Sequence, residues 1–220
     1  MDKPTRPLVI FGVNAVREKL KSAPAEIFEL ILSDGREQRA RLSPVIEEAR
    51  RLGLPVCYVH PHKLDALTGG ALHQGVAAAT APYAYLPLDG LLDEIKTGPA
   101  RVLALDSLTD PMNFGALLRS AEGAGVSHVI IPKDRSVSVT PVVVKASAGA
   151  VNHLKIHRVP NLTRALQDLK EAGCWIVGLD SEAPESIYDR RFPDRVAIVL
   201  GSEGGGLRPL VRRECDFLVS

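Results

Sequence analysis

Four short, continuous apolar runs constrain the fold of this chain more than any other feature. They occupy residues 102–105, 129–131, 175–179 and 196–200, and stretches with helical character separate them. Strands that are apolar on both faces are typical of a parallel sheet that helices cover on its two sides. The sequence therefore predicts an α/β architecture with a parallel sheet in the second half of the chain.

The first 80 residues show a more finely divided pattern. Helices are predicted over 13–21, 43–52 and 61–67, and strands over 27–32, 55–59 and 74–79. Ser43 is the predicted N-cap of the second helix, and Pro44 suits its first helical position. These elements predict a small α/β module that is separate from the later sheet.

The segment between the first 80 residues and the later apolar runs is predicted to be a linker. Three prolines and two glycines interrupt residues 82–99, where only a short helix at 88–95 is predicted. We therefore place the linker over 82–98. It divides the chain into a first domain at 1–81 and a second domain at 99–220.

Composition narrows the class of protein. With 45% hydrophobic and 24% charged residues among 220, the chain is typical of a globular protein and not of a disordered or fibrous one. No apolar stretch approaches the roughly 20 residues that cross a bilayer, and no apolar signal region opens the chain, so we expect a cytoplasmic protein that does not bind membranes. The three cysteines form no Cys-x-x-Cys pair and are expected to be reduced core thiols.

Charge and histidine spacing give little indication of a ligand. The net charge is +1, from 27 Lys+Arg and 26 Asp+Glu, so no overall basic field indicates a nucleic-acid partner. If RNA is the partner, the basic groups have to gather in a local patch that the totals hide. The six histidines show no metal-ligand spacing, and no metal site is predicted.

The first stretch that packing alone does not explain is 106–120, directly after the first strand of the second domain. Open α/β sheets place ligands at such strand ends. Asp110 and Pro111 predict the start of a helix, and Gly115 on its opening turns indicates that another group approaches the backbone closely. A capped helix with a solvated Arg119 is the alternative explanation.

Two further stretches are candidates. Residues 196–207 are a buried strand that leads into a loop with four glycines around Glu203, and glycines let a ligand touch the main chain. The loop lacks the Gly-Lys-Ser/Thr of a phosphate-binding loop, and its glycine spacing is not that of a dinucleotide fold. Residues 140–150 carry small side chains on a predicted helix, where close packing is the safer explanation, although Lys145 and Ser147 could reach a site.

Four motifs of the chain resemble a known family. The stretches NFGALLR at 113–119 and LGSEGGGL at 200–207 are similar to the first two motifs of the SpoU/TrmH family of RNA ribose 2′-O-methyltransferases. The stretches GVNAV at 12–16 and HQGV at 73–76 resemble the ends of the small RNA-binding domain found in many members. The resemblance covers essentially the whole chain and looks nearest to bacterial enzymes that methylate a guanosine ribose in large-subunit ribosomal RNA.

This resemblance implies a knotted α/β catalytic domain that binds S-adenosyl-L-methionine and works as a homodimer. The active-site residues that it assigns are Asn113, Arg119 and Glu203. The cofactor contacts that it assigns are Leu179, Leu200 and Gly201. The first domain would hold RNA, and the arginines after the turn at 33–35 are its candidate phosphate contacts, with a solvated loop as the alternative: Arg36, Arg39 and Arg41.

For methyl transfer we expect Arg119 to meet the phosphate beside the target ribose through a bidentate fork. Asn113 and Glu203 would hold the geometry. Because a guanidinium stays protonated, electrostatic support of the developing alkoxide is favoured over proton abstraction by Arg119.

One part of the family pattern is missing, and other functions stay open. The third motif of the family, a proline-containing loop followed by Ser-Leu-Asn and a closing helix, is not reached before Ser220. We expect the sequence to be part of a longer protein, and the alternative is a chain that cannot bind the methyl donor normally. The alternatives are a tRNA ribose 2′-O-methyltransferase, a non-catalytic RNA-binding protein of the same fold, and a small-molecule α/β enzyme that uses the glycine loop for another nucleotide.

Overall fold

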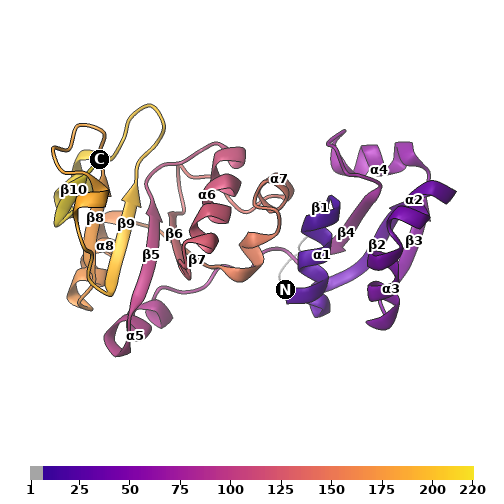
Figure 1. The fold of residues 1–220 in the computed structure, drawn as a ribbon, viewed down its shortest axis with the longest axis horizontal. Coiled ribbons are helices and arrows are strands. Elements are labelled where there is room, and N and C mark those ends of the chain that lie inside the picture. The colour runs from indigo at the N-terminus through magenta and orange to yellow at the C-terminus, as the bar shows by residue number, and fades with distance from the viewer. Residues whose placement is uncertain (1–6) are drawn as a thin grey trace. The chain divides into compact units, whose positions relative to one another are not determined.

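Two compact units make up the structure, a computed structural model that describes residues 7–220 (Figure 1). The first unit comprises residues 7–84 together with 111–119 and 139–153. The second comprises 85–110, 120–138 and 154–220, so it begins inside the predicted linker. The predicted domain boundaries at 81 and 99 stay a prediction.

The first unit is built on a four-stranded sheet in the order β1-β4-β2-β3. Its strands are β1 (Leu8–Phe11), β4 (Val76–Thr80), β2 (Ile27–Ser33) and β3 (Val56–Val59). The strand β4 is antiparallel to both of its neighbours, whereas β2 and β3 are parallel. All five residues of β4 are buried, as its place inside the sheet requires.

Helices of the first unit bury apolar stripes, with one exception. They are α1 (Val13–Ser22), α2 (Arg36–Arg41), α3 (Ser43–Arg51), α4 (Pro61–Thr68) and α7 (Pro141–Ala146), together with the first part of α6 (Pro111–Gly123). In α1, for example, Ala15, Val16 and Leu20 are buried. No residue of α2 is buried, so it has no apolar periodicity, and its arginines lie on a helix and not in the loop that we considered.

The second unit contains a six-stranded sheet in the order β10-β8-β9-β5-β6-β7. Its strands are β10 (Phe217–Val219), β8 (Trp175–Leu179), β9 (Arg195–Leu200), β5 (Ala100–Leu105), β6 (His128–Pro132) and β7 (Lys155–Val159). Every pairing is parallel, which confirms the predicted architecture. The sequence did not indicate β7 or β10, because β7 carries three polar residues and β10 has only three residues in all.

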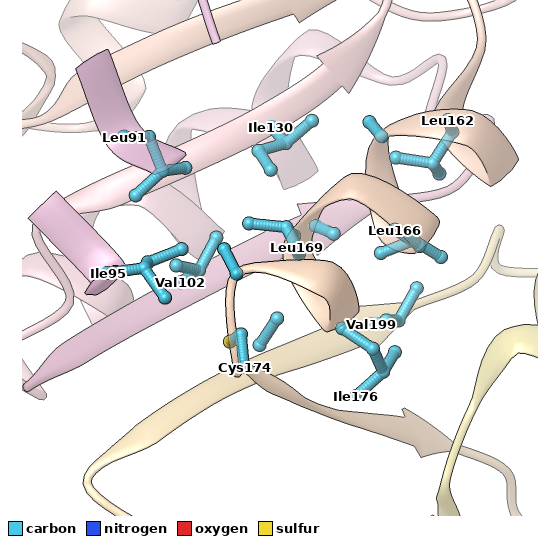
Figure 2. Close-up of a cluster of buried hydrophobic side chains, with 14 of the residues drawn as sticks. Leu91, Ile95, Val102, Ile130, Leu162, Leu166, Leu169, Cys174, Ile176 and Val199 are labelled. Carbon is cyan, nitrogen blue, oxygen red and sulfur yellow. The ribbon is translucent and has the colours of Figure 1, made fainter. Parts of the chain in front are cut away.

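One face of this sheet packs against α5 (Asp89–Thr97) and α8 (Leu162–Glu171), whose apolar side chains interleave with those of the strands (Figure 2). Leu91 and Ile95 of α5 are fully buried in this cluster. Leu166 and Leu169 of α8 are fully buried beside them. The helix predicted inside the linker is therefore part of the hydrophobic core of the second unit.

The direction in which successive strands are added to the sheet changes beside β5. From β5 the chain continues to β6 and β7 on one side, and β9, β8 and β10 lie on the other side. The connections that follow β5 and β9 therefore lead to opposite sides of the sheet order, and such a switch is a position where open α/β sheets bind ligands. The knot that the resemblance implies stays a prediction.

Candidate active site

A cavity of about 830 Å³ lies at the carboxyl ends of β8, β9 and β10. Leu179, Leu200 and Val219 at the strand ends form part of its wall, and residues 180–182 and 201–207 form much of the rest. The volume falls within the roughly 300–1,000 Å³ that small-molecule sites occupy. The three predicted cofactor contacts and Glu203 thus line one cavity, although their roles stay predictions.

The glycine loop that borders this cavity closes on itself. Ser202 and Gly206 exchange two backbone hydrogen bonds, of 3.1 and 3.0 Å. A Cβ at Gly201 would lie 2.0 Å from the carbonyl carbon of Gly206 and 2.4 Å from the amide nitrogen of Leu207. The closed loop therefore excludes any side chain at position 201, whereas a Cβ at Gly204 would meet only open space.

A buried carboxylate fixes the far end of the loop. Asp106 directly follows β5 and is fully buried. Its carboxylate accepts hydrogen bonds from the backbone amide of Arg208, at 2.8 Å, and from Nε of the same residue, at 2.6 Å. The Arg208 side chain is half exposed, but its loss would leave the fully buried carboxylate without its cationic partner, which is destabilising. Asp106 is thus a structural anchor of the site, and its only signal in the sequence is a charge that directly follows a buried apolar strand.

A second ion pair forms part of the cavity wall. Arg212 of α9 (Pro209–Glu214) donates through Nε and Nη2 to one carboxylate oxygen of Asp180, at 3.0 and 2.7 Å. The backbone amide of Glu182 and then this guanidinium hold the pKa of the Asp180 carboxyl below its usual value. The wall therefore presents an ionised carboxylate at neutral pH, which sequence reasoning missed because the pair joins residues 32 positions apart.

The helix α6 begins at Pro111, as predicted, and carries Asn113 and Arg119. Both residues are exposed. Six positions of an α-helix advance about 9 Å along the axis and turn about 120° around it, so the two side chains leave α6 in different directions. Their predicted convergence with Glu203 stays a prediction.

The close approach that Gly115 predicted is made by α7. A Cβ on Gly115 would lie 2.4 Å from Cβ of Ala146 and 2.9 Å from the amide nitrogen of Ser147. This contact joins the first and the third candidate stretches and explains the small residues of both. Ser147 is buried and donates to the carbonyl of Val144 at 3.0 Å, so its hydroxyl serves the local backbone.

The two motifs that resemble the ends of an RNA-binding domain contact each other. The amide of Gly12 donates to the carbonyl of Val76 at 3.1 Å, and the amide of Val13 donates to Oε1 of Gln74 at 3.0 Å. Gln74 and Gly75 both have positive φ, at 57° and 81°. The second motif is therefore a tight turn whose glutamine caps the start of α1.

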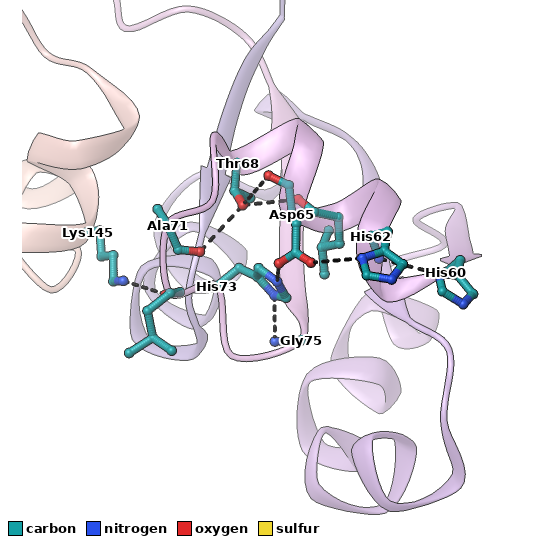
Figure 3. A network of polar contacts seen from close by, with 10 residues as sticks. His60, His62, Asp65, Thr68, Ala71, His73, Gly75 and Lys145 are labelled. Carbon is teal, nitrogen blue, oxygen red and sulfur yellow. Dashed lines mark hydrogen bonds and ion pairs between the residues drawn. The ribbon is translucent and has the colours of Figure 1, made fainter.

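His73 holds this turn together, as Figure 3 shows. Its Nδ1 accepts from the amide of Gly75 at 2.9 Å, so the ring is in the tautomer whose Nε2–H faces Asp65, also at 2.9 Å. Lys145 of α7 donates to the carbonyl of Leu72 in the same turn (Figure 3). Lys145 thus fastens a turn of the first unit, which is a structural contact.

The three arginines of α2 are exposed but do not have equal surroundings. Arg39 pairs with Asp34 at 2.7 Å, and its guanidinium lies over the ring of Tyr58 at 4.2 Å. Arg41 donates to the backbone carbonyl of Gln74 at 2.7 Å. Arg36 forms no such contact with another described residue, so it is the arginine of the three that is most available to a ligand.

Other expectations have mixed outcomes. Cys174 is buried and Cys215 half-buried, but Cys57 is exposed on the edge strand β3, so the expectation of three core thiols is wrong for Cys57.

Within residues 7–220, no group of three or more His, Cys, Asp or Glu side chains is placed to hold a metal ion. No helix in that range has the length and apolar character needed to span a membrane.

A parallel sheet with a glycine loop and a cavity at its carboxyl edge defines an α/β protein with a candidate small-ligand site at the ends of β8, β9 and β10. The chain belongs to the SpoU rRNA methylase family, whose model matches residues 100–220. A second model, described as RNA 2′-O ribose methyltransferase substrate binding, matches residues 9–86. The family resemblance of the sequence is confirmed.

Curated relatives match over nearly the whole chain. The 23S rRNA (guanosine-2′-O-)-methyltransferase RlmB of Xanthomonas campestris is 44% identical over 213 residues, which are 96% of this chain and 85% of the relative. The protein of the same name from Pseudomonas putida is 39% identical over 213 residues, with the same coverage of 96% and 85%. A similar solved structure is that of the SpoU methyltransferase AviRb of Streptomyces viridochromogenes in complex with the cofactor AdoMet. Its TM-score is 0.77 at 23% sequence identity, and the match covers 97% of this chain and 80% of that chain. At that identity the likeness shows the fold.

Proposed function

We propose that this protein transfers a methyl group from S-adenosyl-L-methionine to the 2′-hydroxyl of a ribose in RNA. The observation that carries the proposal is that the loop at 200–207, which is similar to a motif of the family, forms a wall of the cavity. Membership of the SpoU rRNA methylase family supports the reaction class. The names of the curated relatives favour a guanosine of 23S ribosomal RNA as the substrate.

The chemistry of the cavity wall fits the methyl donor. The apolar side chains of Leu179, Ile187 and Leu200 suit an adenine ring, and the glycine loop lets a ligand approach main-chain amides and carbonyls. The wall carries three carboxylates, of Asp180, Glu182 and Glu203, against the one guanidinium of Arg212, and this excess of negative charge favours a cation such as a sulfonium. When bound, the donor supplies an electrophilic methyl group on that sulfonium.

The residues of the chain then have to position the acceptor. In this proposal Arg119 binds the phosphate beside the target ribose and supports the developing alkoxide, while Asn113 and Glu203 orient the ribose. Alignment of two bound reactants can contribute up to roughly 7–11 kcal/mol, so positioning accounts for much of the acceleration. Residues 7–84 of the first unit would hold RNA outside the target nucleotide.

Two further parts of the proposal rest on the family resemblance: the catalytic domain is knotted, and the protein is a homodimer. The protein works in the cytoplasm, which the names of the ribosomal RNA methyltransferases among its relatives support. Light scattering on the purified protein tests the dimer, because a monomer at all concentrations would contradict it.

Replacement of Arg119 tests the role of this residue. We expect Arg119→Ala to lower methylation of a 23S ribosomal RNA transcript at least about 100-fold, because one electrostatic donor in a transition state is typically worth that much. Arg119→Lys should also be strongly impaired, since lysine keeps the charge but loses the planar fork. Arg17→Ala, which removes an exposed arginine from α1, is the matched control and should retain activity.

Calorimetry with S-adenosyl-L-methionine on the same proteins completes the test. Donor binding should be the same in the wild type and both Arg119 variants, and its loss together with turnover would contradict the assigned role. A wild-type protein that binds RNA but no donor would be a non-catalytic RNA-binding protein. Methylation of tRNA without methylation of 23S ribosomal RNA would identify tRNA as the substrate.

A further inference from the structure

Three cations lie at the carboxyl ends of β6 and β7, and none of them is among the residues assigned so far. Lys133 directly follows β6, and Arg135 lies two positions further on. Arg158 lies next to the end of β7, where the parallel register pairs it with Ile131. All three side chains are exposed. We call Lys133, Arg135 and Arg158 the basic edge; the exposed Asp134 lies among them and leaves a local excess of two positive charges.

The structure holds this edge in place. The amide of Lys133 donates to the carbonyl of Val159 at 2.7 Å, and Nη2 of Arg158 donates to the carbonyl of Lys133 at 3.0 Å. The guanidinium of Arg158 also lies over the ring of Tyr85, at 5.4 Å from its centroid. Within the described part of the chain, no ion pair engages the ammonium of Lys133 or the guanidinium of Arg135. Both groups can therefore receive an anion.

The backbone of Arg135 gives an independent indication of function. Its φ is +57°, in the left-handed region that disfavours side chains with a Cβ. Glycine or asparagine would suit this conformation better. Backbone strain of this kind clusters at functional sites, so the conformation of Arg135 is consistent with a role in ligand binding.

The basic edge and the cavity lie along the same edge of one sheet. In the strand order β10-β8-β9-β5-β6-β7, the cavity lies at the ends of the first three strands and the basic edge at the ends of the last two. With strands about 4.8 Å apart, β6 lies about 10 Å and β7 about 14 Å from β9. The amide of Val137 donates to the carbonyl of Leu108 at 2.9 Å and so joins the loop after β6 to the loop after β5. The edge is thus continuous.

We propose that the basic edge binds phosphates of the RNA strand that flanks the target ribose. A strand that presents one ribose at the cavity would continue along the carboxyl edge of the sheet, past β5, onto Lys133, Arg135 and Arg158. The two arginines suit phosphates because a guanidinium can bind an anion through two hydrogen bonds at once. This inference rests on the proposed function, since it takes the cavity as the place of methyl transfer.

The test is a double variant, Lys133→Gln with Arg135→Asn, because asparagine tolerates the left-handed backbone and should not disturb the fold. Binding of a 23S ribosomal RNA transcript is measured over a range of salt concentrations. Loss of two phosphate contacts should reduce the slope of log K against log[salt] by about 1.4, as expected for single-stranded RNA. The melting temperature should not fall, because asparagine suits the left-handed backbone better than arginine, and the affinity for S-adenosyl-L-methionine should not change.

The matched control is Lys96→Gln with Arg101→Gln, which also removes two cations from the second unit. Lys96 lies in the last turn of α5, and Arg101 lies at the amino end of β5, away from the carboxyl edge. This control should keep the wild-type slope. A wild-type slope in the Lys133 and Arg135 variant, or an equal loss in the control, would overturn the inference.

A methylation assay on the wild type distinguishes failure of this inference from failure of the proposed function. If the wild type methylates the transcript and the slope of the double variant is unchanged, the basic edge is wrong and the proposed function stands. If the wild type binds RNA without methylating any, and the slope of the double variant falls, the proposed function is wrong and the basic edge binds RNA phosphates in another role.

Discussion

The glycine loop at 201–206 and the arginines of α2 are two regions in which one residue type is repeated, and their members have unequal roles. In the loop, Gly201 faces the backbone of Gly206, whereas Gly204 borders open space. On α2, Arg39 and Arg41 contact their own chain, whereas Arg36 forms no such contact with another residue of 7–220. A repeated residue type is therefore not a functional unit. Neighbours that are distant in the sequence decide which member has which role.

The largest expected effect is that of Gly201→Ala. Its Cβ would lie within 2.4 Å of three backbone atoms, and relief would require breaking the paired hydrogen bonds of Ser202 and Gly206. We expect a loss of about 3 kcal/mol or more in the free energy of unfolding, together with loss of donor binding. Denaturant titration checks the first and calorimetry the second. Gly204→Ala is the matched control, and its free energy of unfolding should lie within about 0.5 kcal/mol of the wild-type value. Equal effects at the two positions would show that the two glycines do not differ in role.

Gly206→Ala should have a smaller effect than Gly201→Ala. Gly206 has a φ of +60°, but no atom lies within 4 Å of a Cβ placed there. The cost is thus conformational, about 1–2 kcal/mol for an alanine in the left-handed region. Gly206→Asn should recover part of it, because asparagine visits that region more readily. If the asparagine variant is no more stable than the alanine variant, contacts rather than backbone conformation explain the glycine.

The arginines of α2 give a third, smaller contrast. Arg41→Gln removes a hydrogen bond to the carbonyl of Gln74 and should cost about 1 kcal/mol of stability. Arg36→Gln should leave stability unchanged but reduce the salt slope of RNA binding by about 0.7, if Arg36 contacts a phosphate. Thermal unfolding and binding titrations on the same two proteins measure both effects. An equal loss of stability in the two variants would show that their surroundings do not distinguish them.

The smallest effect concerns the three cysteines, which also differ by their surroundings. Burial raises the pKa of the Cys174 thiol to about 12 and that of the Cys215 thiol to about 11, whereas Cys57 is exposed. Thiolates are the reactive form, so iodoacetamide at pH 8 should label Cys57 first. Peptide mass spectrometry over time checks the order. Labelling of Cys174 as fast as Cys57 would mean that the cluster around Cys174 opens readily.

Patterns within single segments predicted much of the fold. The apolar runs at 102–105 and 196–200 indicated buried parallel strands, and Asp110 with Pro111 marked the start of α6. They failed where a segment has no pattern of its own, as in α2, which buries no residue, and in β7, which carries three polar residues. For the site, the sequence indicated the loop at 200–207 but not Asp106, because a single acid after a strand has many explanations.

The sequence by itself determined the parallel sheet, the family and the loop that borders the cavity, since each depends on residues that are neighbours in the chain. Only the tertiary structure decided that Asp106 anchors Arg208, 102 positions away, and that Gln74 caps the helix that begins at Val13. It also decided which glycines the backbone requires and which cations stay available at the basic edge. The physical reason is that burial, close approach and charge pairing are properties of the space between segments, and only folding brings those segments together.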